Sequence, residues 1–213
     1  MNFYHPEMRS VVIAAAEKAG ATVLRGARVV GLLAETPPGV WVRLDANGEH
    51  AYRARLVVGA DGRSSMARQW GGFRVEHDPA GMTIAGLRID GLAAPEDTMS
   101  GFVHPGYGMV SLTVPLGNGR FRAYVGRHKR DGAPERPWRG KTAIADFVSA
   151  NIAAGAPPTW YASDLQVAGP LASFDAADRW VPHPQRAALV LVGDAAASND
   201  PCFGCGLSLS RDR

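Results

Sequence analysis

The sequence contains no long apolar run. No window reaches about 18 consecutive apolar residues, the length that a membrane-spanning helix requires, so the sequence predicts no transmembrane helix. The first ten residues include Glu7 and Arg9 where a signal peptide would have its apolar region. We therefore expect a cytoplasmic protein without a membrane partner, and 213 residues suffice for one domain or two small ones.

Cysteine is scarce. The two cysteines, Cys202 and Cys205, have C-x-x-C spacing. A structural zinc site needs four ligands, usually from a second such pair or from closely spaced histidines, and the six histidines show no such spacing. We therefore predict no metal site. The pair could act as a redox dithiol, but the surrounding Pro-Cys-Phe-Gly-Cys-Gly is typical of a Gly-rich turn, in which the two cysteines need no thiol chemistry.

Lysine is nearly absent. The chain has 23 basic and 20 acidic residues, a net charge of +3, and nearly all of the basic residues are arginine. One local basic cluster comprises Arg120, Arg122, Arg127, Lys129 and Arg130. A nucleic-acid surface would need a basic stripe with interleaved aromatic residues or a known module. We interpret this cluster as a solvated strand face and expect no nucleic-acid partner.

The first 70 residues alternate between helical and strand patterns. Apolar residues recur at helical spacing over 6–19, with Gly20 as the C-terminal cap. Strands are predicted at 21–24, 28–33, 40–44, 50–53 and 55–59. Asn47-Gly48 predicts a hairpin, and the apolar run at 55–59 predicts a buried strand. Ser64 or Ser65 can cap a short helix that ends at Trp70.

The pattern changes between residues 75 and 180. Short alternating strands are predicted at 82–89, 109–114 and 120–125, with a hairpin-like turn at 116–119 and one helix at 141–154. This indicates a mostly antiparallel sheet. Its aromatic and sulfur-containing side chains could line an apolar pocket, although core packing is their more common role: Phe102, Tyr107, Met109, Phe121 and Trp160. A buried strand at 187–192 then precedes a Gly-rich turn that enters a final helix.

Two segments share one design, in which an apolar strand runs into glycine and aspartate and then into a helix. The first covers 56–68 and contains Asp61-Gly62, and the second covers 189–208 and contains Gly193-Asp194. Ligands of open α/β sheets bind beyond the carboxyl ends of strands, where glycines permit close approach and helix starts offer N–H groups to anionic oxygens. The sequence therefore predicts a nucleotide-cofactor site built from both segments.

These two motifs resemble those of the FAD-dependent monooxygenase superfamily typified by para-hydroxybenzoate hydroxylase. Residues 58–68 match its Asp-Gly motif through Ser65 and Arg68, and residues 193–206 match its Gly-Asp motif. The resemblance implies an α/β (α+β) fold class, in which an incomplete Rossmann-like FAD-binding domain contains an inserted, mostly antiparallel substrate sheet. The expected FAD-binding part is 1–74 with 186–213, and the expected substrate domain is 75–185.

The resemblance also implies roles for individual residues. Asp194 would bond ribityl or ribose hydroxyls of FAD, and Asp61 and Gly62 would lie by the pyrophosphate and the route of NAD(P)H. Arg68 would anchor its helix. The remaining cofactor-binding residues implied by the second motif are Gly193, Pro201, Gly204, Gly206 and Leu207. Oxygen activation would belong to the flavin, acting with NAD(P)H and O2 on a small organic substrate such as an aromatic ring. No catalytic side chain is identified, and the sequence does not indicate an oligomeric state.

The chain departs from the family pattern at its ends. The fingerprint G-x-G-x-x-G, which the family places at its N-terminus, is absent, since Gly106-Tyr107-Gly108 has Ser111 at the third position. Cys205 replaces the usual glutamine, and the last helix stops at Arg213. We interpret the chain as a copy truncated at both ends. Two alternatives remain: a non-catalytic fragment of such an enzyme, and a thiol oxidoreductase that uses Cys202 and Cys205.

Overall fold

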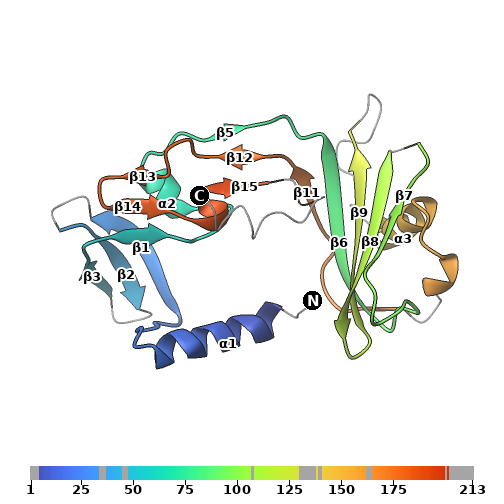
Figure 1. Ribbon diagram of the computed structural model, residues 1–213, viewed down its shortest axis with the longest axis horizontal. Helices are drawn as coiled ribbons and strands as arrows, with labels where there is room; N and C mark the ends of the chain where they lie inside the picture. Colours follow the sequence, from blue (N-terminus) through green and yellow to red (C-terminus); the bar gives the residue numbers. More distant parts are fainter. Residues whose placement is uncertain are drawn as a thin grey trace. The chain divides into compact units, whose positions relative to one another are not determined.

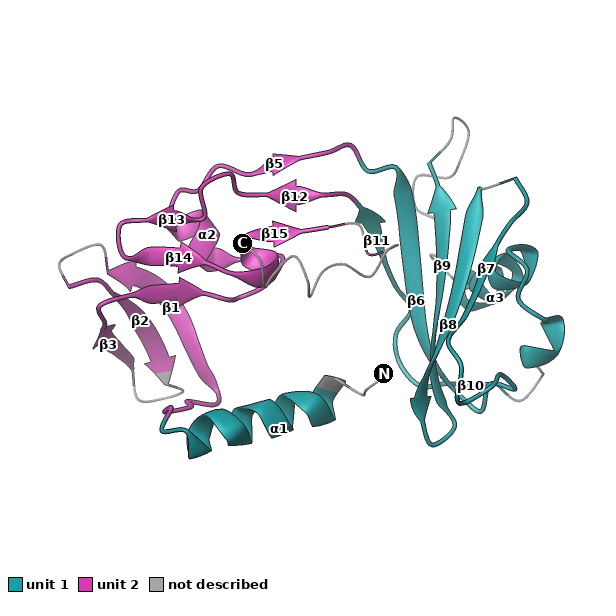
Figure 2. Cartoon of the chain, viewed as in Figure 1, with its two compact units in different colours: residues 1–20, 80–176 teal, residues 21–79, 177–213 magenta. Residues whose placement is uncertain are grey.

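The computed structural model describes residues 5–33, 37–44, 48–106, 108–129, 138, 141–161, 165–199 and 201. The chain divides into two compact units (Figure 2). Unit 1 comprises Met1–Gly20 with Ala80–Ala176, and unit 2 comprises Ala21–Pro79 with Ala177–Arg213. Because compactness alone defines these units, the division into a cofactor domain and a substrate domain stays a prediction.

Unit 1 is built on a six-stranded antiparallel sheet (Figure 1). The strand order is β10-β6-β9-β8-β7, and β11 also pairs with β6. The strands are β6 (Met82–Asp90), β7 (Ser100–Val103), β8 (Met109–Gly117), β9 (Arg120–His128), β10 (Gln166–Val167) and β11 (Ala172–Ala176). The predicted strands at 82–89, 109–114 and 120–125 and the turn at 116–119 are thus confirmed, because alternation and turn residues are local signals.

Helix α3 (Ala143–Ala153) packs against β8 and β9 and confirms the predicted helix. Its Phe147 side chain is fully buried among apolar residues of the sheet. Asn151 of the same helix is also fully buried; its side-chain amide donates to the Phe147 carbonyl oxygen, and its Oδ1 accepts from the Ser111 hydroxyl of β8. A buried amide with both partners satisfied fixes the register of helix against sheet.

The candidate pocket aromatics are part of this packed layer where they are described. Phe121 is buried in the core, and Phe102 meets Trp160 of the 3₁₀ helix η2 (Pro158–Trp160) edge to face, with ring centroids 5.6 Å apart. Tyr107 lies outside the described residues. This supports the interpretation of Phe121, Phe102 and Trp160 as core residues.

Helix α1 (His5–Lys18) belongs to unit 1 and follows the predicted helix closely. Glu7 lies in its first turn, where a negative charge complements the helix dipole, and Lys18 lies in its last turn. Gly20, two residues beyond, has a φ of +94°, as expected of a residue that ends a helix.

The described residues of unit 2 form three small sheets and one short helix. Strands β1 (Ala27–Leu33), β2 (Gly39–Leu44) and β3 (Glu49–Arg53) form an antiparallel meander. The second sheet has the order β13-β14-β4, with β4 (Val57–Gly59), β13 (Gln185–Arg186) and β14 (Leu189–Leu191). The third sheet joins β15 (Ala197–Ser198), β12 (Arg179–Trp180) and β5 (Glu76–His77). The helix is α2 (Met66–Trp70), and η3 (Gly193–Ala195) is a single 3₁₀ turn.

These elements confirm the α/β (α+β) fold class, and β4 and β14 are the parallel pair that it requires. Three details of the prediction were wrong. The buried strand predicted at 187–192 is limited to β14 at Leu189–Leu191, of which only Leu191 is fully buried. Residues 21–24 form no strand, because they are mostly exposed and pair with no neighbour. The run at 55–59 is not a fully buried strand, since Val58 is 51% exposed. Ala67 of α2 packs against the face that Gly59 and Leu191 share, and Val58, which precedes Gly59 in the strand, points to the opposite face.

No described helix is both long and apolar enough to cross a membrane.

Candidate functional site

The two sequence motifs leave neighbouring strands at the same edge of a sheet. Strands β4 and β14 are parallel, and Gly59 pairs with Leu191 at their carboxyl ends. The Val192 amide donates to the Gly59 carbonyl oxygen at 3.0 Å, so the pairing continues past the last strand residue. The Asp61-Gly62 loop and the Gly193-Asp194 loop therefore begin side by side, at the edge where open α/β sheets bind ligands.

Asp61 holds the start of α2. One carboxylate oxygen accepts from the amides of Met66 at 2.7 Å and Ala67 at 3.0 Å. The buried Ser65 hydroxyl donates to the same carboxylate and accepts from the Arg68 amide at 2.9 Å, which makes Ser65 the predicted N-cap. Partial burial alone would raise the pKa of Asp61, but these hydrogen bonds together lower it below its ordinary value. The carboxylate is thus engaged within the chain.

Replacing Asp61 with alanine is expected to lower the free energy of unfolding by about 1 kcal/mol at neutral pH, the usual loss for a helix-capping side chain. A depressed folded-state pKa stabilises above the unfolded-state pKa, and this stabilisation disappears as pH falls through the lower folded-state value. The difference between wild type and Asp61→Ala should therefore shrink below about pH 4. Urea titrations across pH measure it, with exposed Asp78→Ala as control. A difference that is constant with pH would contradict the assignment.

Arg68 joins the two motifs. Its guanidinium donates to the Arg63 carbonyl oxygen at 2.7 Å within the first motif. It also donates to the carbonyl oxygens of Ala195 at 3.0 Å and Asp194 at 3.5 Å in the second. A planar guanidinium can meet several acceptors at once without moving the backbone. Arg68 therefore anchors α2, as expected, and additionally fixes the second loop against the first.

Two glycines shape the loops. Gly62 has a φ of +79° and Gly193 a φ of +58°, a region that residues with a side chain rarely adopt. A Cβ atom added at either position would meet nothing within 4 Å, so the backbone conformation, not crowding, requires glycine there. Open space beside the backbone at both strand ends is what close approach of a ligand needs.

Asp194 is the carboxylate that remains available. It lies in η3 directly after β14, and its side chain is exposed. Its backbone carbonyl oxygen accepts from Arg68, but its carboxylate has no hydrogen-bond or ion-pair partner within the described residues. An ionised carboxylate with free acceptor sites at a strand end suits the hydroxyl groups of a sugar or ribityl chain. The residues present therefore fit the ribityl part of a flavin nucleotide.

Only part of the second half of the Gly-Asp motif lies within the described residues. Pro201 is described and exposed. Gly204, Gly206 and Leu207 lie outside the described residues, and so do Cys202 and Cys205. The helix start implied for the isoalloxazine ring, and the dithiol hypothesis, thus stay predictions.

Gly59 is a structural residue that the predicted binding set did not include. A Cβ atom at this position would lie 2.7 Å from the Ala67 Cβ and 2.8 Å from Leu191 Cδ2. Glycine here lets α2 close onto the strand pair. The available signal was a glycine at the end of an apolar run, just before a loop.

Comparison with known proteins places these observations in a family. The FAD binding domain family matches residues 2–211. Digeranylgeranylglycerophospholipid reductase 1 of Methanococcoides burtonii is 29% identical over 201 residues, which are 92% of this chain and 46% of that protein. Rifampicin monooxygenase of Rhodococcus hoagii is 28% identical over 214 residues, which are 96% of this chain and 41% of that protein.

The chain also resembles a solved structure. The crystal structure of CabE, an aromatic hydroxylase from angucycline biosynthesis, superposes with a TM-score of 0.70 at 27% identity, over 94% of this chain and 39% of that one. The chain thus spans less than half the length of the relatives it matches. Because the family match extends over almost every residue, the chain belongs to the FAD binding domain family, and its resemblance to the FAD-dependent monooxygenases is confirmed.

Proposed function

We propose that this chain supplies the flavin-holding strand ends and the substrate sheet of a flavin-dependent monooxygenase that uses NAD(P)H and O2 on a small aromatic substrate. The main support is the pair of adjacent loops in unit 2, joined by Arg68, in which the Asp194 carboxylate has no partner among the described residues. The names of two relatives, a monooxygenase and an aromatic hydroxylase, support the reaction class.

The residues of unit 2 would divide the work of holding FAD. Asp194 would accept hydrogen bonds from ribityl hydroxyls, and Gly62 and Gly193 would let the cofactor approach the backbone. Arg68 would keep the two loops at a fixed separation. The bound flavin supplies the redox chemistry with O2, and the protein supplies position and electrostatics.

The test is a titration of the purified chain with FAD, read by visible flavin absorbance retained through gel filtration. Asp194→Ala is expected to raise the Kd by about tenfold, the effect of losing one hydrogen bond to a charged acceptor. Asp78→Ala, an exposed aspartate of the same unit, is the matched control and should leave the Kd unchanged.

Equal FAD affinity of wild type and Asp194→Ala would remove Asp194 from the site. No retention of flavin by the wild-type chain would contradict flavin binding by these residues alone and favour the non-catalytic fragment. Cysteine-dependent turnover without flavin would favour the thiol oxidoreductase.

A further inference from the structure

The turn between β8 and β9 carries the dipeptide Asn118-Gly119. Both residues have a positive φ, +56° for Asn118 and +68° for Gly119, and Gly117 pairs with Arg120 across the turn. This is the geometry of a two-residue type I′ turn. Asn118 is exposed, so water reaches its side-chain amide. An asparagine before glycine is the most prone to lose that amide, because glycine has no side chain to hinder attack by its own backbone nitrogen.

One contact holds the nitrogen that would attack. The Gly119 amide donates to Glu96 Oε2 at 3.2 Å. The ladder of a two-residue hairpin joins the residues that flank the turn, so it does not use this amide. Glu96 comes from the connection between β6 and β7. Its carboxylate accepts the proton that must leave before the nitrogen can attack, and its negative charge disfavours an anionic nitrogen beside it.

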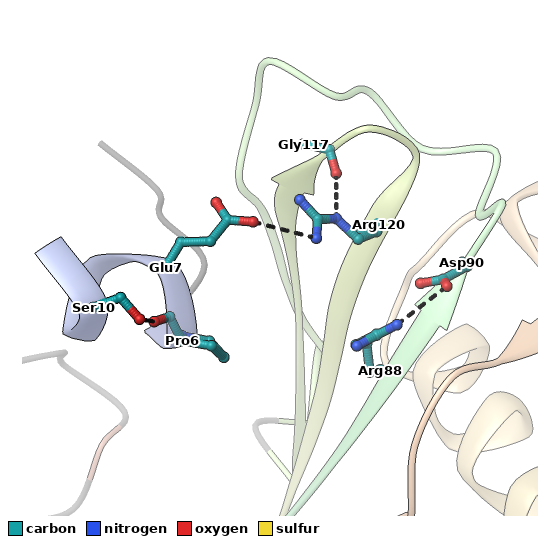
Figure 3. A network of polar contacts seen from close by, with 7 residues as sticks. All are labelled: Pro6, Glu7, Ser10, Arg88, Asp90, Gly117 and Arg120. Atoms are coloured by element: carbon teal, nitrogen blue, oxygen red, sulfur yellow. Dashed lines mark hydrogen bonds and ion pairs between the residues drawn. The ribbon is translucent and has the colours of Figure 1, made fainter. Parts of the chain in front are cut away.

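Further hydrogen bonds hold the backbone of the turn. The Gly119 carbonyl oxygen accepts from the Gly91 amide at 2.9 Å. Figure 3 shows that Arg120 Nε donates to the Gly117 carbonyl oxygen, at 3.0 Å. Closing a five-membered ring between the Asn118 side chain and the Gly119 nitrogen requires the backbone to rotate out of the left-handed conformation. The turn must therefore open locally before the reaction can occur.

We propose that Asn118 is a site of spontaneous deamidation and that its contact-holding neighbour Glu96 sets the rate. The Gly119 nitrogen loses its proton to water and bonds to the side-chain carbonyl carbon of Asn118. The bond from that carbon to the amide nitrogen breaks, and ammonia leaves. Water then opens the cyclic imide at either carbonyl, which leaves aspartate or isoaspartate at position 118. Water is the only co-reactant, and nothing is oxidised or reduced.

The modification would act on the centre of the sheet. Isoaspartate adds one carbon to the backbone of a two-residue turn, and the length of that turn sets the register of β8 against β9. The modified chain is therefore expected to melt at a lower temperature than the fresh chain. The inference is independent of the proposed function, because Glu96 and Asn118-Gly119 all belong to unit 1.

The test follows the reaction in the full chain at mildly alkaline pH by the masses of tryptic peptides. The peptide 89–120 contains Asn118 as its only amide side chain, and the peptide 44–53 contains Asn47 before Gly48 as an internal reference. Glu96→Ala should raise the rate at Asn118 about fivefold, the effect of losing one typical hydrogen bond, and should leave the rate at Asn47 unchanged.

Two further variants separate the contact from general effects. Glu96→Gln keeps a neutral acceptor and should react at a rate between those of wild type and Glu96→Ala. Asp97→Ala removes an exposed neighbouring carboxylate, which accepts from the Thr98 hydroxyl, and should react as wild type does. In guanidinium chloride, wild type and Glu96→Ala should react equally fast, since the contact exists only in the folded chain.

An unchanged rate in folded Glu96→Ala would overturn the role of Glu96. A slower rate would overturn it as well, because the carboxylate would then be acting as a base that promotes attack. A faster rate at both dipeptides would mean general opening of the chain in place of a specific contact. If Asn118 stayed intact in every folded variant while Asn47 reacted, position 118 would not be a deamidation site.

Discussion

Replacing Arg68 with alanine is expected to lower the free energy of unfolding by about 3 kcal/mol. Its guanidinium donates to three carbonyl oxygens, and two of them belong to a loop more than 120 residues away in the sequence. A hydrogen bond from a charged donor contributes about 1.5–3 kcal/mol net, and bonds made by one group are not additive. Urea denaturation measures the loss, and the FAD titration should show weaker binding because the two loops are no longer joined.

Arg68→Lys is the informative companion variant. Lysine keeps the charge, but a single ammonium group cannot span acceptors in both loops. The variant should therefore fall between wild type and Arg68→Ala in stability. If Arg68→Ala unfolds at the wild-type urea concentration, the cross-motif hydrogen bonds contribute nothing measurable, and the loops are held by strand pairing alone.

Local signals in the sequence predicted most of the strands and caps. Ser64 or Ser65 was predicted to cap the helix because a serine before a helical run provides an acceptor for free amides, and the structure shows that Ser65 does so, by accepting from the Arg68 amide. The turn between β8 and β9 was equally readable from its glycines and asparagine. Each of these features is decided by a few adjacent residues.

Features that depend on distant residues were predicted less well. Burial of the run at 55–59 was overestimated, because the exposed fraction of Val58 depends on what covers the sheet, not on its own hydropathy. The contact of Arg68 with Ala195 could not be read from spacing, since 127 positions separate the two residues. The family resemblance implied that the two motifs lie together. In the structure, the parallel pairing of β4 with β14 brings them side by side.

The candidate site also combines features that adjacent residues predict with features that depend on distant residues. Asp61 was expected to lie near the pyrophosphate, and that role stays a prediction. The structure adds that its carboxylate accepts hydrogen bonds from the first backbone amides of α2. Motif matching identifies which residues are characteristic of a family, but it does not distinguish a residue that contacts the ligand from one that orders the loop. The hydrogen-bond partners of each carboxylate make that distinction: the Asp61 carboxylate is engaged, whereas the Asp194 carboxylate is exposed and has no partner among the described residues.

Gly59→Val is expected to lower the free energy of unfolding by about 3 kcal/mol or more, because it forces a side chain into space that Ala67 and Leu191 already fill. Even the first atom of that side chain would lie 2.7 Å from the Ala67 Cβ and 2.8 Å from Leu191 Cδ2, well inside van der Waals contact. Either α2 moves off the strand pair or β4 separates from β14. Gly81→Val is the control, since a Cβ atom there meets nothing within 4 Å and its φ is not positive.

A partial rescue would show that crowding causes the loss. In Gly59→Ala, the added methyl group competes with that of Ala67, so Ala67→Gly should restore part of the lost stability despite its own cost of about 1 kcal/mol as a helical glycine. Additive losses in the double variant would contradict a direct clash between these two positions. Because β4 and β14 carry the two loops, rescue of stability should be accompanied by rescue of FAD affinity if, as proposed, the spacing of the loops forms the flavin site.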